Sequence, residues 1–227
     1  MTDNQMREPQ YQRMLDGDGV ESRTRLGLMI NYAWADDPKR LAFTFARYKF
    51  VAKMLEGTDR VLEIGCGDGF VSRVVAQSVG ALTAVDFDQV FITDAKALAT
   101  TERWPITFQQ HDILEGPVAG PFDAAFSMDV MEHIEPDRED AYLANIAAGL
   151  TDHGTFIAGM PSLESQAYAS VASREGHVNC KTGPDLKAAL GRYFHTVFLF
   201  SMNDEVVHTG YHKMAHYLIA IGVGPRR

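Results

Sequence analysis

Three glycines alternate with other residues directly behind a short apolar run, in the segment VLEIGCGDGF at residues 61–70. Gly65, Gly67 and Gly69 would let the backbone turn tightly and approach a ligand closely. The segment holds two acids, one of them Glu63, and no lysine or arginine. A phosphate-binding P-loop needs Lys and then Ser or Thr after its last glycine, and neither is present. The segment therefore predicts a ligand site that is not a triphosphate site.

Two further acids follow later apolar runs. Asp86 comes about twenty residues after Gly65, where dinucleotide-binding proteins place the acid that binds the ribose. The third glycine of the dinucleotide fingerprint would fall at position 70, which is Phe70. Glu63 before the glycines and Asp112 after a third run are additional carboxylates. Together they favour a ligand with hydroxyl groups, an exocyclic amine and a cationic amino acid end.

Three histidines lie where they could serve a reaction: His133 in DVMEH, His177 in GHVN, and His208 in a long loop near the end. Histidine is the usual base for a hydroxyl group, but each of the three could also have a purely structural role. Cys66 and Cys180 lack a CxxC spacing. His208, His212 and His216 are four apart, but they run into an expected strand. We therefore expect no metal site.

Apolar runs and amphipathic segments alternate along the chain, which predicts strands and helices in turn. We expect an α/β fold: a doubly wound, seven-stranded, mostly parallel sheet with helices on both faces and an antiparallel last strand. The expected strands are residues 60–65, 82–87, 106–112, 122–130, 154–160, 196–202 and 216–223. The expected helices are residues 38–56, 70–79, 89–99, 137–150, 162–176 and 182–194. We expect residues 1–37 to form an N-terminal arm or cap and residues 38–227 to form the main domain.

The composition excludes several classes of function. The formal net charge is −9, with a sequence pI near 5.3, and no basic strip is present, so we expect no nucleic-acid partner. No apolar stretch is long enough for a membrane helix or reads as a secretory signal. We therefore expect a cytoplasmic protein without membrane association. The oligomeric state stays open.

With these motifs in place, the sequence resembles the class I S-adenosylmethionine (SAM)-dependent methyltransferases of small molecules. LEIGCGDG, VDFD, HDI and FDAAFSMDVMEHIEP match four family motifs in order and spacing. The resemblance implies SAM as cofactor and S-adenosylhomocysteine (SAH) as product. It also implies which residues contact each part of the cofactor. The methionine end would be held by Glu63, Gly65, Cys66 and Gly67, and the ribose by Asp86. The adenine would be contacted by Phe87, Asp112 and Ile113, and the methyl group would be flanked by Met128 and Asp129.

The acceptor is less constrained. The resemblance favours methyl transfer to an O or N atom of a small polar metabolite, such as a sugar, a nucleotide sugar or a natural-product intermediate. Tyr32 and Trp34 in the arm, with Asn203 in the long loop, are expected to cover the pocket. Three alternatives stay open: an NAD-dependent oxidoreductase, a non-catalytic SAM-fold protein, and a metal-assisted RNA 2'-O-methyltransferase. The last of these has an E-x-x-E-H motif, whereas this chain has Asp129 in place of the first Glu.

Overall fold

The computed structural model describes residues 6–14, 25–100 and 104–227. Within these ranges one eight-stranded sheet has the order β3-β2-β1-β4-β5-β8-β6-β7. Its strands are β1 (Arg60–Ile64), β2 (Ala81–Asp86), β3 (Ile106–Gln110), β4 (Phe122–Met128), β5 (Leu150–Pro161), β6 (Phe194–Asn203), β7 (Val206–His208) and β8 (Tyr217–Pro225). The first five strands are parallel, and β8 is antiparallel to both of its neighbours. The predicted fold class is confirmed.

The sheet has one strand more than expected. The segment predicted as a long loop before β8 contains β7, which pairs with the end of β6, and the 3₁₀ turn η4 (His212–Met214). The chain reverses between β6 and β7 at Asp204, whose φ of 49° is left-handed. That conformation is easier for Asp than for most residues, and it lets the loop fold back as a hairpin.

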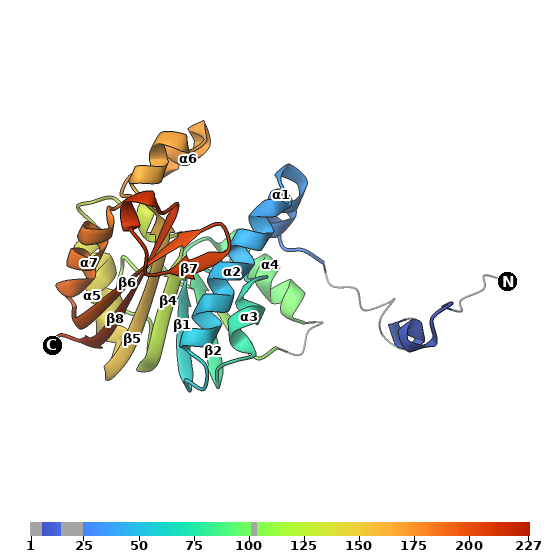
Figure 1. Ribbon diagram of the computed structural model, residues 1–227. Coiled ribbons are helices and arrows are strands. Elements are labelled where there is room, and N and C mark those ends of the chain that lie inside the picture. The colour runs from blue at the N-terminus through green and yellow to red at the C-terminus, as the bar shows by residue number, and fades with distance from the viewer. Residues whose placement is uncertain (1–5, 15–24, 101–103) are drawn as a thin grey trace.

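Helices cover both faces of the sheet (Figure 1). They are α1 (Leu28–Asp36), α2 (Lys39–Met54), α3 (Ser72–Ala76), α4 (Gln89–Ala99), α5 (Glu139–Gly149), α6 (Val171–Gly176) and α7 (Gly183–Gly191), with 3₁₀ turns η1 (Pro9–Met14), η2 (Met131–His133) and η3 (Glu164–Tyr168). Alternate residues of β1 enter different cores. Val61 packs in the core with α2 and α3, whereas Leu62 and Ile64 pack in the core with α5 and α7.

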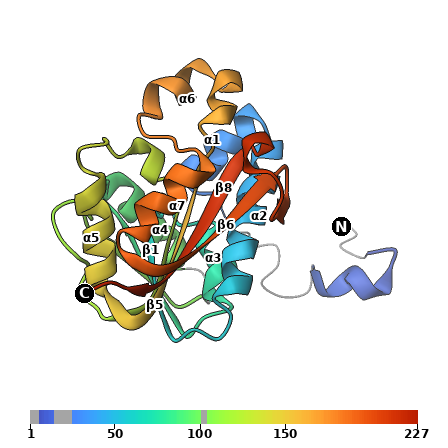
Figure 2. The ribbon, with the colours of Figure 1, turned by 60° about the vertical axis from the view of Figure 1, so that its left-hand side comes forward.

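The prediction of one continuous helix over residues 162–176 is wrong. Ala169 is extended, and it separates η3 from α6. The Ser170 side chain then accepts a hydrogen bond from the backbone N–H of Ser173, which begins α6 as a new helix. Figures 1 and 2 show α6 and α1 at the same end of the sheet, where the parallel strands end.

The predicted N-terminal arm is described only in part, because residues 1–5 and 15–24 lie outside the described residues. Its last part is α1, which leads directly into α2. None of the helices in the described ranges has the length and apolar character that crossing a membrane requires.

Candidate active site

The turn after β1 requires its glycines. Gly65, Gly67 and Gly69 have φ of 73°, 53° and 64°, in the left-handed region. The N–H groups of Gly65 and Cys66 both donate to the Val85 carbonyl of β2, at 2.8 and 3.0 Å. The loop is thereby fixed to the end of the neighbouring strand.

Glu63 points from β1 into the layer beneath α2, and its side chain is almost fully buried. One oxygen, Oε1, accepts a hydrogen bond of 2.8 Å from the Tyr48 hydroxyl, while Oε2 is buried without a hydrogen-bond partner. Burial raises the pKa of Glu63 to about 7, although the Tyr48 hydrogen bond opposes the shift. An incompletely paired buried carboxylate fits the cationic amino group of a methionine moiety.

Cys66 is buried beside this carboxylate, and burial raises the pKa of its thiol. A thiol that stays protonated is a poor nucleophile, so Cys66 contributes its small size and its backbone to the loop.

Asp86 is the last residue of β2, and its side chain supports the glycine loop. Its Oδ2 accepts from the Gly67 N–H and its Oδ1 from the Asp88 N–H, both at 2.9 Å. Each oxygen keeps a further lone pair, so the carboxylate can still accept from a ribose diol. Phe87 follows with 70% of its surface exposed, which leaves its ring free to cover a ligand.

The predicted adenine contacts after β3 differ in burial. Asp112 is exposed, and its Oδ1 accepts from the Leu114 N–H at 2.9 Å. Ile113 is buried in the core, and its carbonyl accepts from the Asn145 side chain at 2.7 Å. The roles assigned to Asp112 and Ile113 stay predictions.

At the end of β4, Met128 and Asp129 lie beside a cation that the sequence pattern did not single out. Arg47 of α2 forms an ion pair of 2.7 Å with the Asp129 carboxylate. Its guanidinium carbon also lies 3.8 Å from the centre of the Tyr217 ring, a cation–π contact. The Tyr217 hydroxyl in turn reaches the Met128 sulfur at 3.8 Å. Asp129 itself has a left-handed φ of 58°, which turns the chain sharply at this point.

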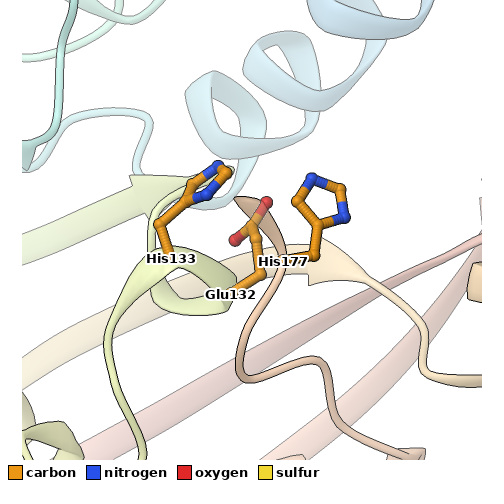
Figure 3. A group of neighbouring side chains, drawn as sticks. All are labelled: Glu132, His133 and His177. Carbon is orange, nitrogen blue, oxygen red and sulfur yellow. The ribbon is translucent and has the colours of Figure 1, made fainter. Parts of the chain in front are cut away.

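Glu132, His133 and His177 converge next to this pair (Figure 3). Each offers one ligand atom, and these atoms lie within 4.8 Å of one another. Glu132 is 1% exposed, and in residues 6–14, 25–100 and 104–227 neither of its carboxylate oxygens has a hydrogen-bond partner. Burial, and then the nearby Asp129, raise the pKa of Glu132 well above its usual range. The two imidazole rings lie edge to face with centroids 5.1 Å apart.

His177 is held in this group by a network around Glu139. The Asn179 N–H donates to the Glu132 carbonyl at 3.0 Å, and the Asn179 side chain donates to Glu139 at 2.9 Å. Lys181 and Arg192 pair with the same Glu139 carboxylate, each at 2.7 Å. These contacts fasten the segment after α6 to η2, and so they set the position of His177.

His208, the third predicted histidine, lies in the β6–β7 hairpin. One ring nitrogen, Nε2, lies 2.9 Å from the Asn203 Oδ1, and Nδ1 accepts from the Gly210 N–H at 2.9 Å. Asn203 also donates to the Met214 carbonyl at 3.0 Å. In the described part of the chain, these bonds connect His208 and Asn203 to the hairpin and to η4, not to His133 or His177.

In the arm, Met29 and Ile30 contact the glycine loop, while Tyr32 and Trp34 are 70% and 54% exposed. The N–H of Ile30, at the start of α1, donates to Asp68 at 2.9 Å. The Met29 side chain lies so close to Gly67 that a Cβ there would collide with its sulfur. The covering role of Tyr32 and Trp34 stays a prediction.

Sequence reasoning missed Arg47, Glu132 and Tyr217. Glu132 stood inside the quoted DVMEH motif, so its adjacency to His133 was an available signal. Arg47 is a charged residue in a predicted helix whose buried side is otherwise apolar, which is only a weak signal for a functional role. Tyr217 lies in an apolar strand, and nothing in the sequence distinguished it.

Residues 61–154 match the model of a family described as a methyltransferase domain. The chain has the class I methyltransferase fold. It is 17% identical to the N-methyltransferase NodS from Bradyrhizobium japonicum WM9, solved in complex with SAH, with a TM-score of 0.64 over 87% of this chain and 93% of that one. The predicted class I fold and the predicted cofactor, SAM, are confirmed.

Two curated relatives match part of the domain. An uncharacterised methyltransferase of Mycobacterium tuberculosis (strain ATCC 25618 / H37Rv) is 36% identical over 101 residues, which is 44% of this chain and 49% of the relative. A ubiquinone biosynthesis O-methyltransferase of Xanthomonas axonopodis pv. citri (strain 306) is 29% identical over 119 residues, 50% of this chain and 49% of the relative. The chain thus spans about half the length of the curated relatives it matches.

Proposed function

We propose that the chain transfers the methyl group of SAM to an oxygen or nitrogen atom of a small polar metabolite, such as a sugar, a nucleotide sugar or a natural-product intermediate. The observation that carries this is a group of charged and titratable residues beside the glycine loop: Asp129, Glu132 and His133 after β4, with His177 and Arg47. Its innermost member, Glu132, is 1% exposed. We expect a small molecule to suit such an enclosed group better than a folded protein or a duplex.

SAM supplies an activated methyl group, so the protein mainly has to position the acceptor and exclude water. Glu63 and the glycine loop would hold the methionine end, and Asp86 would hold the ribose. A hydroxyl acceptor needs help in losing its proton, and the His133 and His177 side chains lie where they could act on it. An amine acceptor only has to be neutral, so these histidines favour an oxygen acceptor.

The other classes are less well supported. The net charge of −9 and the acids around the acceptor site oppose an RNA substrate. Phe70 stands where the dinucleotide fingerprint needs glycine, which opposes NAD. The complete set of cofactor residues opposes a protein that has lost catalysis. A small polar acceptor is also consistent with the cytoplasmic location that we propose.

The test uses SAM with a deuterated methyl group and a metabolite extract, followed by mass spectrometry of the small-molecule, RNA and protein fractions. We expect the label in one small molecule and its absence when Asp86→Ala replaces the wild type. Label confined to RNA or protein would contradict the proposed acceptor class. Tight binding of NADH with no binding of SAH would contradict the cofactor assignment.

A further inference from the structure

We propose that Glu132, His133 and His177 bind one divalent transition-metal ion, and that this ion binds the acceptor oxygen. From the sequence alone we expected no metal: Asp129 replaces the first Glu of the E-x-x-E-H motif, so the metal-assisted class was only an alternative. The three residues come from η2 and from the segment after α6, which only the fold brings together. This inference rests on the proposed function for the role of the ion, but not for its binding.

The donor atoms are close enough for a single ion. Two donors on one zinc-like ion, each about 2.1 Å from it, lie at most about 4.2 Å apart. The donor atoms of this group lie within 4.8 Å of one another. Small side-chain rotations therefore suffice to close the site.

Glu132 supplies the electrostatic reason for a cation. Its two carboxylate oxygens are buried, and neither has a hydrogen-bond partner among the described residues, although the side chain is enclosed by protein. A buried carboxylate in this state is costly unless a cation or a donor pairs with it. Arg47, the nearest cation named in this region, pairs with Asp129. A divalent ion would satisfy both oxygens.

Both histidines are oriented as metal ligands usually are. The Nδ1 of His133 lies 2.8 Å from the backbone carbonyl oxygen of Gly176. The Nδ1 of His177 lies 2.9 Å from the side-chain amide oxygen of Gln166. A carbonyl can only accept, so both Nδ1 atoms carry the proton and both Nε2 atoms keep a lone pair. A carbonyl acceptor behind the imidazole fixes the ring and raises its basicity toward a metal.

The donor set defines the ion and its use. Two imidazoles and one carboxylate suit Zn²⁺, Co²⁺, Fe²⁺ or Mn²⁺ better than Mg²⁺ or Ca²⁺. Three protein ligands leave a coordination position open, as in catalytic rather than structural sites. A hydroxyl bound there would lose its proton at a lower pH and become a better nucleophile, with the proton passing to solvent.

Co²⁺ is the probe for the binding test, because its visible absorption reports the number and type of ligands. The protein is treated with a chelator, dialysed, and titrated with CoCl₂. We expect one equivalent to bind in the wild type. We expect Glu132→Gln and His177→Ala each to weaken binding at least about tenfold, in line with the loss of a ligand or its support.

His153→Ala is the matched control. His153 is exposed at the start of β5, the opposite end of the strand from the site, and its loss should leave Co²⁺ binding unchanged. SAH affinity and thermal unfolding are measured for every variant, so that a misfolded variant is recognised. Failure of the wild type to bind Co²⁺, or unchanged binding in both site variants, would overturn the inference.

The two proposals fail in different ways. If the chelated protein methylates its small acceptor at the full rate, the role of the ion in methyl transfer is refuted and the proposed function stands. If the protein binds Co²⁺ through these residues but labels no small molecule, the proposed acceptor class is wrong and the metal site stands. We expect the chelated protein to lose methyl transfer, to regain it with Zn²⁺, Co²⁺ or Mn²⁺, and to bind SAH equally well throughout.

Discussion

The cofactor side and the acceptor side of this domain are built in different ways. On the cofactor side, Glu63, the glycine loop and Asp86 lie within one strand–helix–strand unit, and each follows or ends a strand. On the acceptor side, Arg47 comes from α2, Glu132 and His133 from η2, and His177 from the segment after α6. The first site is local in sequence, whereas the second exists only after the chain has folded.

The two sides also differ in how their polar groups are satisfied. The Asp86 carboxylate already accepts from two backbone N–H groups, so the ligand adds to an existing structure. Within the part of the chain that the structure describes, the Glu132 carboxylate has no hydrogen-bond partner, so the acceptor side has a polar group left to satisfy. Substitutions should therefore separate the two sides by the ligand they affect.

The largest effect is expected on the cofactor side, from Asp86→Ala. A ribose diol held by one carboxylate loses two charge-assisted hydrogen bonds, about 2 to 4 kcal/mol in total. SAH affinity measured by calorimetry should therefore fall by about 30-fold to about 700-fold. Unchanged SAH affinity in a folded variant would show that the cofactor contacts lie elsewhere.

Asp88→Ala is the control for this substitution. Asp88 is an acid two residues away whose side chain caps α4 by accepting from the Val90 N–H at 2.8 Å. Its loss should lower stability by about 1 kcal/mol and leave SAH affinity within about twofold. Equal losses of affinity in both variants would mean that loop order, and not ribose binding, accounts for the effect of Asp86.

The contrast explains what the sequence could predict. A strand ending in alternating glycines has few possible backbones, so the positions of Gly65, Gly67 and Asp86 follow from local rules. The position of His177 depends on Glu139, which lies about forty residues earlier in the chain and shows no local signal. The extra strand β7 also escaped prediction, because it depends on a tight turn at Asp204 and pairs over only a few residues.

The next largest effect is expected from Glu139→Gln, which loosens the segment that holds His177. Burial alone would raise the pKa of Glu139, but its bonds to Lys181 and Asn179 outweigh burial and lower it. The ionised group therefore stabilises the fold above its unfolded pKa, and this is lost as the pH falls through the lower folded value. At neutral pH the variant should lose about 1 to 2 kcal/mol, since Arg192 is half exposed.

Urea unfolding at neutral and acidic pH measures this difference, which should shrink at acidic pH. Methyl transfer should fall in the variant while SAH affinity stays unchanged. Asp140→Asn is the matched control, because this neighbouring acid is exposed and pairs with the same Arg192 at 3.0 Å. Such an exposed pair contributes about 0 to 1 kcal/mol. An equal loss in both variants would contradict the anchoring role of Glu139.

A smaller effect is expected from pH on cofactor binding. The pKa of Glu63 is about 7 in the ligand-free protein, because burial and the nearby Asp68 carboxylate raise it more than Ser72, Tyr48 and the charge of Arg73 lower it. The ammonium group of SAH binds best to the ionised carboxylate. Affinity should therefore rise about tenfold per pH unit up to about pH 7 and then level off. Glu63→Gln should bind weakly with a flat profile, and a flat wild-type profile would show that Glu63 is ionised throughout.

The smallest effect is expected from His208→Ala, although the sequence placed His208 beside the acceptor. Its Nδ1 accepts from Gly210, and its Nε2 faces the Asn203 carbonyl oxygen, which can only accept. Neutral His208 therefore has no free lone pair with which to take a proton. Its loss should lower stability by about 1 kcal/mol and change methyl transfer by less than about twofold. A fall of about 10² to 10⁴, as expected when a general base is lost, would mean that the hairpin opens and that His208 acts on the acceptor.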